Sequence, residues 1–138
     1  MKTAFADTMY WVAILMPKDQ WASSAKSARE SLGDVQLLTT DEVLTEFLAL
    51  ANSRENLRRQ AAKLVRSIFD DPEIEIIPQS RDSFLQGLEL FERRPDKEYS
   101  LTDCISMNVM RENGVTQVLT NDHHFAQEGF TILMASPK

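Results

Sequence analysis

The chain has few residues of the kinds that build disulfides and zinc sites. Its 138 residues include one cysteine, Cys104, and two adjacent histidines, His123 and His124. One cysteine excludes an intramolecular disulfide and cannot by itself form a thiolate zinc site, which fits a reducing cytosol. Two histidines are too few for a metal site built from histidine alone. We therefore expect a cytoplasmic protein.

The chain also lacks a long hydrophobic run and an excess of positive charge. The apolar run Met9–Met16 is too short to span a bilayer and has no small-residue cleavage site, so we expect neither a targeting segment nor membrane insertion. The net charge of -6 argues against a protein that coats nucleic acid through bulk charge. It does not exclude an enzyme that acts on nucleic acid through bound cations, because the basic groups of such an enzyme can be local.

Short apolar strands alternate with helices along the chain. Its length, 43% hydrophobic residues and 26% charged residues predict one globular domain over residues 1–138, and no repeat or linker interrupts it. The predicted strands lie near residues 3–6, 35–38, 73–77, 115–119 and 130–133. The predicted helices lie at 9–16, 21–32, 39–51, 53–69, from 80 to about 91, 100–113 and 123–127. This alternation predicts an α/β fold with a mainly parallel five-stranded sheet flanked by helices.

Several local signals place the helices more closely. Thr39 and Glu42 fit a Thr-x-x-Glu capping box at the start of one helix. The helix 53–69 carries basic residues on its outer face, and the helix 100–113 is apolar on nearly every side. The first pattern is most often a solvated face, and the second predicts a central, buried helix that ends at Gly114.

Two acids follow predicted strands. Asp7 ends the first strand and Asp122 follows the fourth, in each case just before a helix. The simplest interpretation of either residue alone is a helix N-cap. However, the carboxyl ends of strands in open α/β sheets meet at the edge where ligands bind. Both acids are therefore candidates for a site at that edge.

Two further acids lie on predicted helices. Glu46 falls at the edge of an apolar stripe, where it can face a cleft or reach solvent, and the pattern does not decide between the two. Asp103 shares a stripe with Met107 and Met110 in the helix predicted to be buried. Ser100-x-x-Asp103 also resembles a capping box, a role that is compatible with binding a metal.

A cluster of these four carboxylates predicts a divalent cation. Carboxylates that pack together repel one another and tend to hold protons, and a cation removes that penalty. Magnesium and manganese prefer oxygen ligands, and magnesium keeps waters that leave room for a substrate phosphate. A cation in such a site can activate water and stabilise charge on the phosphate, which fits phosphodiester hydrolysis.

Four segments of the chain resemble a known family, and together they span nearly its whole length. They are Phe5-Ala-Asp7-Thr8, Thr39-Thr-Asp-Glu-Val-Leu-Thr-Glu46, Ser100-Leu-Thr-Asp103 and Leu119-Thr-Asn-Asp-His-His-Phe125. In order and spacing these segments are similar to those of PIN domains, specifically the toxin ribonucleases of the VapC type. The last two segments are the most specific, and no single segment would be sufficient.

The resemblance implies a PIN-like, Rossmann-like sheet and an RNA-cleaving site. Asp7, Glu46, Asp103 and Asp122 would form the acidic metal-binding and catalytic quartet for Mg²⁺ or Mn²⁺, with Asp7 and Asp103 as principal ligands of one cation. Thr8 and Thr120 would be supporting hydroxyls that hold the acids or the substrate. The resemblance also implies a homodimer, an RNA substrate and a small VapB-like antitoxin.

Other residues and other functions remain open at this stage. Arg54, Arg58 and Lys63 are candidate RNA contacts, although a solvated helix face is the favoured interpretation. His123 and His124 are expected to be exposed turn residues rather than metal ligands. The main alternative function is a catalytically inactive PIN-like module that binds RNA or protein. A phosphoacceptor receiver domain would need an acidic pair after the first strand, where Asp7 stands alone.

Overall fold

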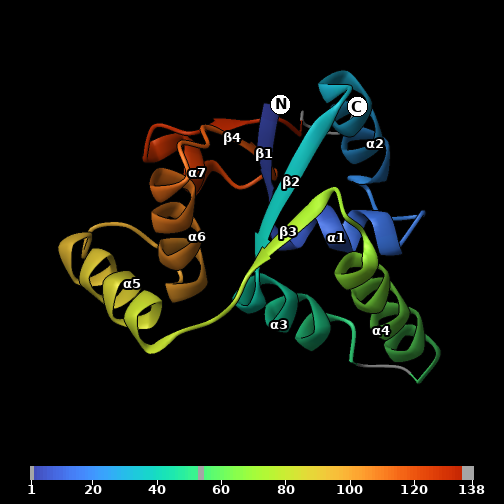
Figure 1. Ribbon diagram of the computed structural model, residues 1–138, viewed down its shortest axis with the longest axis horizontal. Coiled ribbons are helices and arrows are strands. Elements are labelled where there is room, and N and C mark those ends of the chain that lie inside the picture. Colours follow the sequence, from blue (N-terminus) through green and yellow to red (C-terminus); the bar gives the residue numbers. More distant parts are fainter. Residues whose placement is uncertain (1, 53–54, 135–138) are drawn as a thin grey trace.

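Five parallel strands form the sheet in the computed structural model, which describes residues 2–52 and 55–134 (Figure 1). The strands are β1 (Lys2–Ala6), β2 (Val35–Thr40), β3 (Ile74–Ile77), β4 (Gln117–Leu119) and β5 (Thr131–Ile132). Their order across the sheet is β3-β2-β1-β4-β5, and each neighbouring pair is parallel. The order reverses between β1 and β4, and ligands of open α/β sheets bind at such a switch point, beyond the carboxyl ends of the strands.

Helices cover both faces of the sheet. They are α1 (Thr8–Leu15), α2 (Ala22–Leu32), α3 (Asp41–Leu50), α4 (Glu55–Asp70), α5 (Arg81–Arg93), α6 (Leu101–Glu112) and α7 (His123–Gln127). Figure 1 shows α1, α2 and α4 on one side of the sheet and α5, α6 and α7 on the other, with α3 at the carboxyl end of β2. The prediction of an α/β fold with a parallel five-stranded sheet is confirmed.

The start of α3 differs from the predicted capping box. Thr40 is the N-cap residue, and its hydroxyl accepts a hydrogen bond from the backbone N–H of Val43 at 3.1 Å. Thr39 is instead the fifth residue of β2 and donates its hydroxyl to the carbonyl of Ala6 in β1 at 2.9 Å. The assignment of Thr39 and Glu42 to a capping box was therefore wrong, because pairing with β3 extends β2 through Thr40.

The apolar run near the N-terminus belongs to the core. Tyr10, Trp11 and Ala13 in α1 are each 3% exposed. Among residues 2–52 and 55–134, no helix combines the length and the hydropathy needed to cross a bilayer.

Helix α6 is buried, as its sequence predicts. Seven of its residues are buried, among them Asp103, Cys104 and Met107. It packs against α5 at Gly87, where a Cβ atom would lie 2.5 Å from Cγ1 of Ile105. This close approach fixes α6 against its neighbour and so fixes the helix turn that carries Asp103.

Candidate active site

Asp7 lies directly after β1, at the N-cap position of α1, but its side chain does not cap that helix. Its Oδ2 instead accepts a hydrogen bond from the hydroxyl of Thr120, at 2.9 Å. Thr120 follows β4, and the backbone N–H of Asp7 donates to the carbonyl of Leu119 at 3.2 Å. The N-cap interpretation of the Asp7 carboxylate was wrong, and the side chain is held at the switch point between β1 and β4.

The environment of Asp7 disfavours its negative charge. Asp7 is 4% exposed, and its pKa is raised from 3.8 to about 7. Burial is the largest cause, and the negative charges of Asp103 and Glu46 raise the pKa further. Hydrogen bonds from the Thr8 backbone and the Thr120 hydroxyl oppose the shift. Asp7 therefore interacts electrostatically with two of the other three predicted acids.

Asp103 occupies the first turn of α6. The backbone N–H of Ser100 donates to Asp103 Oδ2 at 3.1 Å, and the backbone N–H of Asp103 donates to Ser100 Oγ at 3.0 Å. The predicted Ser100–Asp103 capping box is confirmed. Burial, followed by the charges of Asp122 and Glu46, raises the pKa of the Asp103 carboxyl. The capping bonds orient this carboxylate, and the same Oδ2 lies 3.4 Å from Nδ1 of His124.

Asp122 is the N-cap of α7, as the sequence predicts. Its Oδ1 accepts a hydrogen bond from the backbone N–H of His124 at 2.9 Å, and its own N–H donates to Thr120 Oγ1 at 3.1 Å. Thr120, which is fully buried, thus contacts both Asp7 and Asp122. One hydroxyl fixes the relative positions of two acids that are far apart in the sequence.

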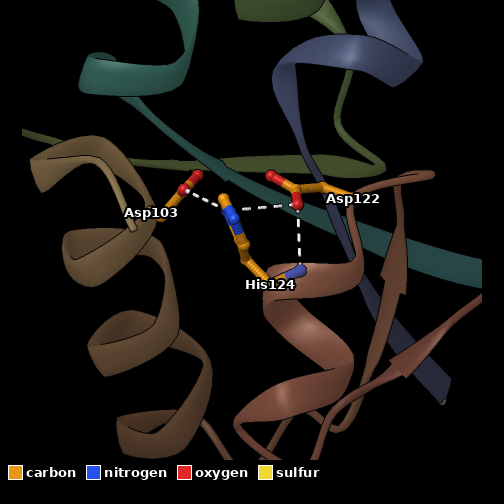
Figure 2. Close-up of side chains that lie close together, drawn as sticks. All are labelled: Asp103, Asp122 and His124. Atoms are coloured by element: carbon orange, nitrogen blue, oxygen red, sulfur yellow. Dashed lines mark hydrogen bonds and ion pairs between the residues drawn. The ribbon is translucent and has the colours of Figure 1, made fainter. Parts of the chain in front are cut away.

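The structure brings Asp103, Asp122 and His124 into one group, shown in Figure 2. One ligand atom from each of the three lies within 4.8 Å of the other two, so a single ion could contact all three. Asp7 and Glu46 are not members of this tight group. Glu46, on α3 and partly buried, acts on it through its charge, which raises the pKa of both Asp7 and Asp103.

His124 is the residue of this group that the sequence-based prediction missed. His123 is exposed, as expected, but the side chain of His124 is only 26% exposed and its ring lies between the two carboxylates (Figure 2). The N-cap prediction for Asp122 contained the signal, because an N-cap oxygen lies beside the second or third residue of its helix.

The surroundings of the acids include an unsatisfied hydroxyl and, apart from His124, no basic neighbour among the described residues. Among the described residues, no lysine or arginine forms an ion pair with any of the four predicted acids. Thr8 is 2% exposed, and its buried hydroxyl has no hydrogen-bond partner within residues 2–52 and 55–134. Clustered acids without lysine or arginine, beside an unpaired buried hydroxyl, are compatible with a bound cation and its waters.

The predicted RNA contacts lie elsewhere. Arg58 and Lys63 are exposed on α4, which Figure 1 shows across the sheet from α6 and α7. Arg54 lies outside the described residues. The structure therefore gives no contact between this basic face and the acidic group.

Comparisons with known proteins identify the family of this chain. A family model described as PIN domain matches residues 4–130. The 23S rRNA-specific endonuclease VapC20 of Mycobacterium tuberculosis is 29% identical over 126 residues, which are 91% of this chain and 94% of the relative. The crystal structure of Mycobacterium tuberculosis VapC20, a sarcin-ricin loop cleaving toxin, has a TM-score of 0.83 and 27% identity, and covers 93% of this chain and 96% of its own.

A more distant structure has the same fold. VapBC2 from Rickettsia felis, bound to a DNA fragment from its promoter, has a TM-score of 0.68 and 16% identity, and the match covers 94% of this chain and 96% of that chain. The family model spans both the acids at the ends of β1 and β4 and the intervening helices. We conclude that this chain belongs to the PIN domain family.

Proposed function

We propose that this protein is a metal-dependent endoribonuclease that hydrolyses RNA phosphodiester bonds. Family membership and the similarity to VapC20, a 23S rRNA-specific endonuclease, support this function. The observation that carries it is the acidic group at the switch point of the sheet, where Asp103 and Asp122 lie within reach of one ion and their charge is not balanced by lysine or arginine.

Asp7, Glu46, Asp103 and Asp122 are the proposed metal-binding and catalytic residues, and Mg²⁺ or Mn²⁺ is the proposed cofactor. The donor set fits such an ion, because carboxylates are its usual protein ligands and a buried hydroxyl, that of Thr8, remains to hold water or substrate. A divalent cation held there would supply positive charge against the scissile phosphate and lower the pKa of a bound water.

Hydrogen bonds within the chain position three of the four acids. Ser100 orients Asp103, and Thr120 orients Asp7 and Asp122, so the ligands are positioned before a cation or RNA arrives. Glu46 completes the negative site from α3, at the carboxyl end of β2. Such preorganisation is what an enzyme needs to stabilise charge that develops during reaction.

The biological setting follows from the same relatives. We propose that the protein is the toxin of a toxin–antitoxin pair, acts in the cytoplasm as a homodimer, and is blocked by a small VapB-like antitoxin. Ribosomal RNA is the first substrate to assay, because VapC20 cleaves the sarcin-ricin loop. Arg58 and Lys63 are proposed to contact RNA phosphates away from the site of cleavage.

The test is cleavage of an end-labelled sarcin-ricin loop RNA by purified protein with Mg²⁺ or Mn²⁺. We expect cleavage that EDTA stops and that Asp103→Asn and Asp7→Asn abolish, with circular dichroism showing an intact fold. Glu112→Gln is the matched control, because Glu112 is an exposed acid on the same helix as Asp103. The protein would instead be a catalytically inactive binding module if it bound RNA in a cation-dependent way but cleaved neither this RNA nor mixed cellular RNA.

A further inference from the structure

His124 is placed as a contact of the acidic group by its own backbone. It is the second residue of α7, and its N–H donates to Asp122 Oδ1 at 2.9 Å. From there its ring turns back, so that Nδ1 lies 3.2 Å from Asp122 Oδ1 and 3.4 Å from Asp103 Oδ2 (Figure 2). The neighbouring His123 is exposed and has no such contact among the described residues.

The Nδ1 atom lies at ion-pair distance from both carboxylates. It is shielded from solvent and has no hydrogen-bond partner within the described part of the chain. A buried ring nitrogen left without a partner is unfavourable unless another group satisfies it. The atom therefore lies between two carboxylate oxygens. A cation bound by both oxygens would also contact this nitrogen.

The distances fit ligands of one ion. Adjacent ligands of an octahedral ion with bonds of about 2.1 Å lie about 3.0 Å apart. The two Nδ1–oxygen distances, 3.2 and 3.4 Å, are close to this value, and the ligand atoms of all three residues lie within 4.8 Å of one another. Only a small adjustment would bring the three atoms into contact with a single cation.

The imidazole ring is held in this direction by packing. The ring of Tyr99 lies edge-on to that of His124, with centroids 5.4 Å apart and planes at 60°. Tyr99 is 4% exposed and donates its hydroxyl to Glu128 Oε2 at 3.2 Å. Arg94 and Arg111 each form an ion pair with Glu128 at 3.1 Å. The edge-on contact with Tyr99 therefore restricts the orientation of the imidazole ring.

We propose that His124 Nδ1 is a ligand of the same cation as Asp103 and Asp122, and that this nitrogen makes the site prefer Mn²⁺ over Mg²⁺. The inference rests on the proposed metal-dependent function and adds the identity of a ligand and of the ion. Imidazole binds transition-metal ions well, whereas Mg²⁺ prefers oxygen and retains its waters. A donor set that includes an imidazole beside the carboxylates is therefore a poorer site for Mg²⁺ than for Mn²⁺.

The experiment measures the metal rather than the reaction. Wild-type protein is loaded with Mn²⁺, and pulsed electron paramagnetic resonance detects whether a ¹⁴N nucleus is coupled to the ion. Labelling of histidine with ¹⁵N checks that the nitrogen belongs to histidine. Calorimetry then gives the affinities for Mn²⁺ and Mg²⁺ in the wild type, in His124→Asn and in the matched control His123→Asn.

We expect a histidine nitrogen coupling in the wild type and in His123→Asn, and its loss in His124→Asn. Mn²⁺ affinity should fall about tenfold or more in His124→Asn, whereas Mg²⁺ affinity should change much less. Absence of a nitrogen coupling in the wild type overturns the inference without any variant. So does a coupling that survives in His124→Asn, or an equal loss of affinity for both ions.

The same measurements separate this inference from the proposed function. Mn²⁺ binding that requires Asp103 but shows no nitrogen coupling leaves the nuclease site intact and removes only His124 as a ligand. If the wild type binds neither Mn²⁺ nor Mg²⁺, or if Asp103→Asn binds both ions as the wild type does, the proposed metal centre fails and the inference fails with it.

Discussion

Asp7 provides a quantitative test of the idea that negative charge at this site destabilises the fold until a cation binds. The carboxyl is buried, and its pKa rises from 3.8 to about 7. A difference of roughly 3 units corresponds to about 4 kcal/mol, at 1.36 kcal/mol per unit, between the folded and unfolded proteins above pH 7. Asp7→Asn removes the charge but keeps an oxygen that can accept the hydrogen bond from Thr120.

The sign follows from proton binding. Between pH 4 and pH 7 the folded protein holds a proton on Asp7 that the unfolded chain has released, so stability falls as pH rises through this range. In EDTA, we expect Asp7→Asn to be more stable than the wild type by up to about 4 kcal/mol at pH 8. The difference should shrink to less than about 1 kcal/mol near pH 4, where Asp7 is protonated in the folded state and about half protonated in the unfolded state.

Urea unfolding, followed by tryptophan fluorescence, measures this difference, because Trp11 is 3% exposed and should report loss of the core. Addition of Mn²⁺ or Mg²⁺ at pH 8 should stabilise the wild type and have little effect on Asp7→Asn, since only a ligand that binds the folded state shifts the equilibrium. The reasoning is refuted if Asp7→Asn is no more stable than the wild type in EDTA at pH 8.

Three further substitutions test the fold by urea unfolding. Thr40→Ala should lower the free energy of unfolding by about 1 kcal/mol through loss of the N-cap, whereas Glu42→Ala should change it little. If Glu42→Ala were the more destabilising of the two, the capping box predicted from the sequence would be supported instead. Thr39→Val should cost about 1–2 kcal/mol, because a buried carbonyl at the end of β1 loses its donor, and Thr39→Ser should recover most of this loss. Gly87→Ala should be destabilising by about 1–2 kcal/mol, because overpacking against Ile105 exceeds the helix propensity gained; an unchanged or raised stability would show that Ile105 moves freely.

The parts of the fold that sequence could predict are those set by local signals. Ser100 and Asp103 lie three residues apart on the chain, so their reciprocal hydrogen bonds follow from the spacing alone. The burial of α6 likewise follows from its apolar pattern. The order of strands and helices came from the same kind of pattern and was sufficient to give the fold class.

The features that sequence could not predict depend on residues distant along the chain. Thr39 matches a helix cap locally, but the register of β2 against β3 keeps it in the strand. Asp7 also matches a helix cap, but Thr120, which is 113 residues away, takes its carboxylate instead. His124 turns inward because α6 brings Asp103 and Tyr99 beside it. In each case a tertiary contact gives the residue a different role from the one that its local sequence indicates.

The capping bonds offset part of the cost of bringing two acids together at one site. Asp103 Oδ2 accepts from Ser100, and Asp122 Oδ1 accepts from His124, so each carboxylate satisfies a backbone N–H with one oxygen. The partial positive charge at each helix N-terminus also favours these anions before a cation binds. Because asparagine keeps an accepting oxygen, substitution of Asp103 or Asp122 by asparagine removes charge while retaining the cap. Loss of cation binding in such variants would therefore reflect the charge of the ligands rather than failure of α6 or α7 to form.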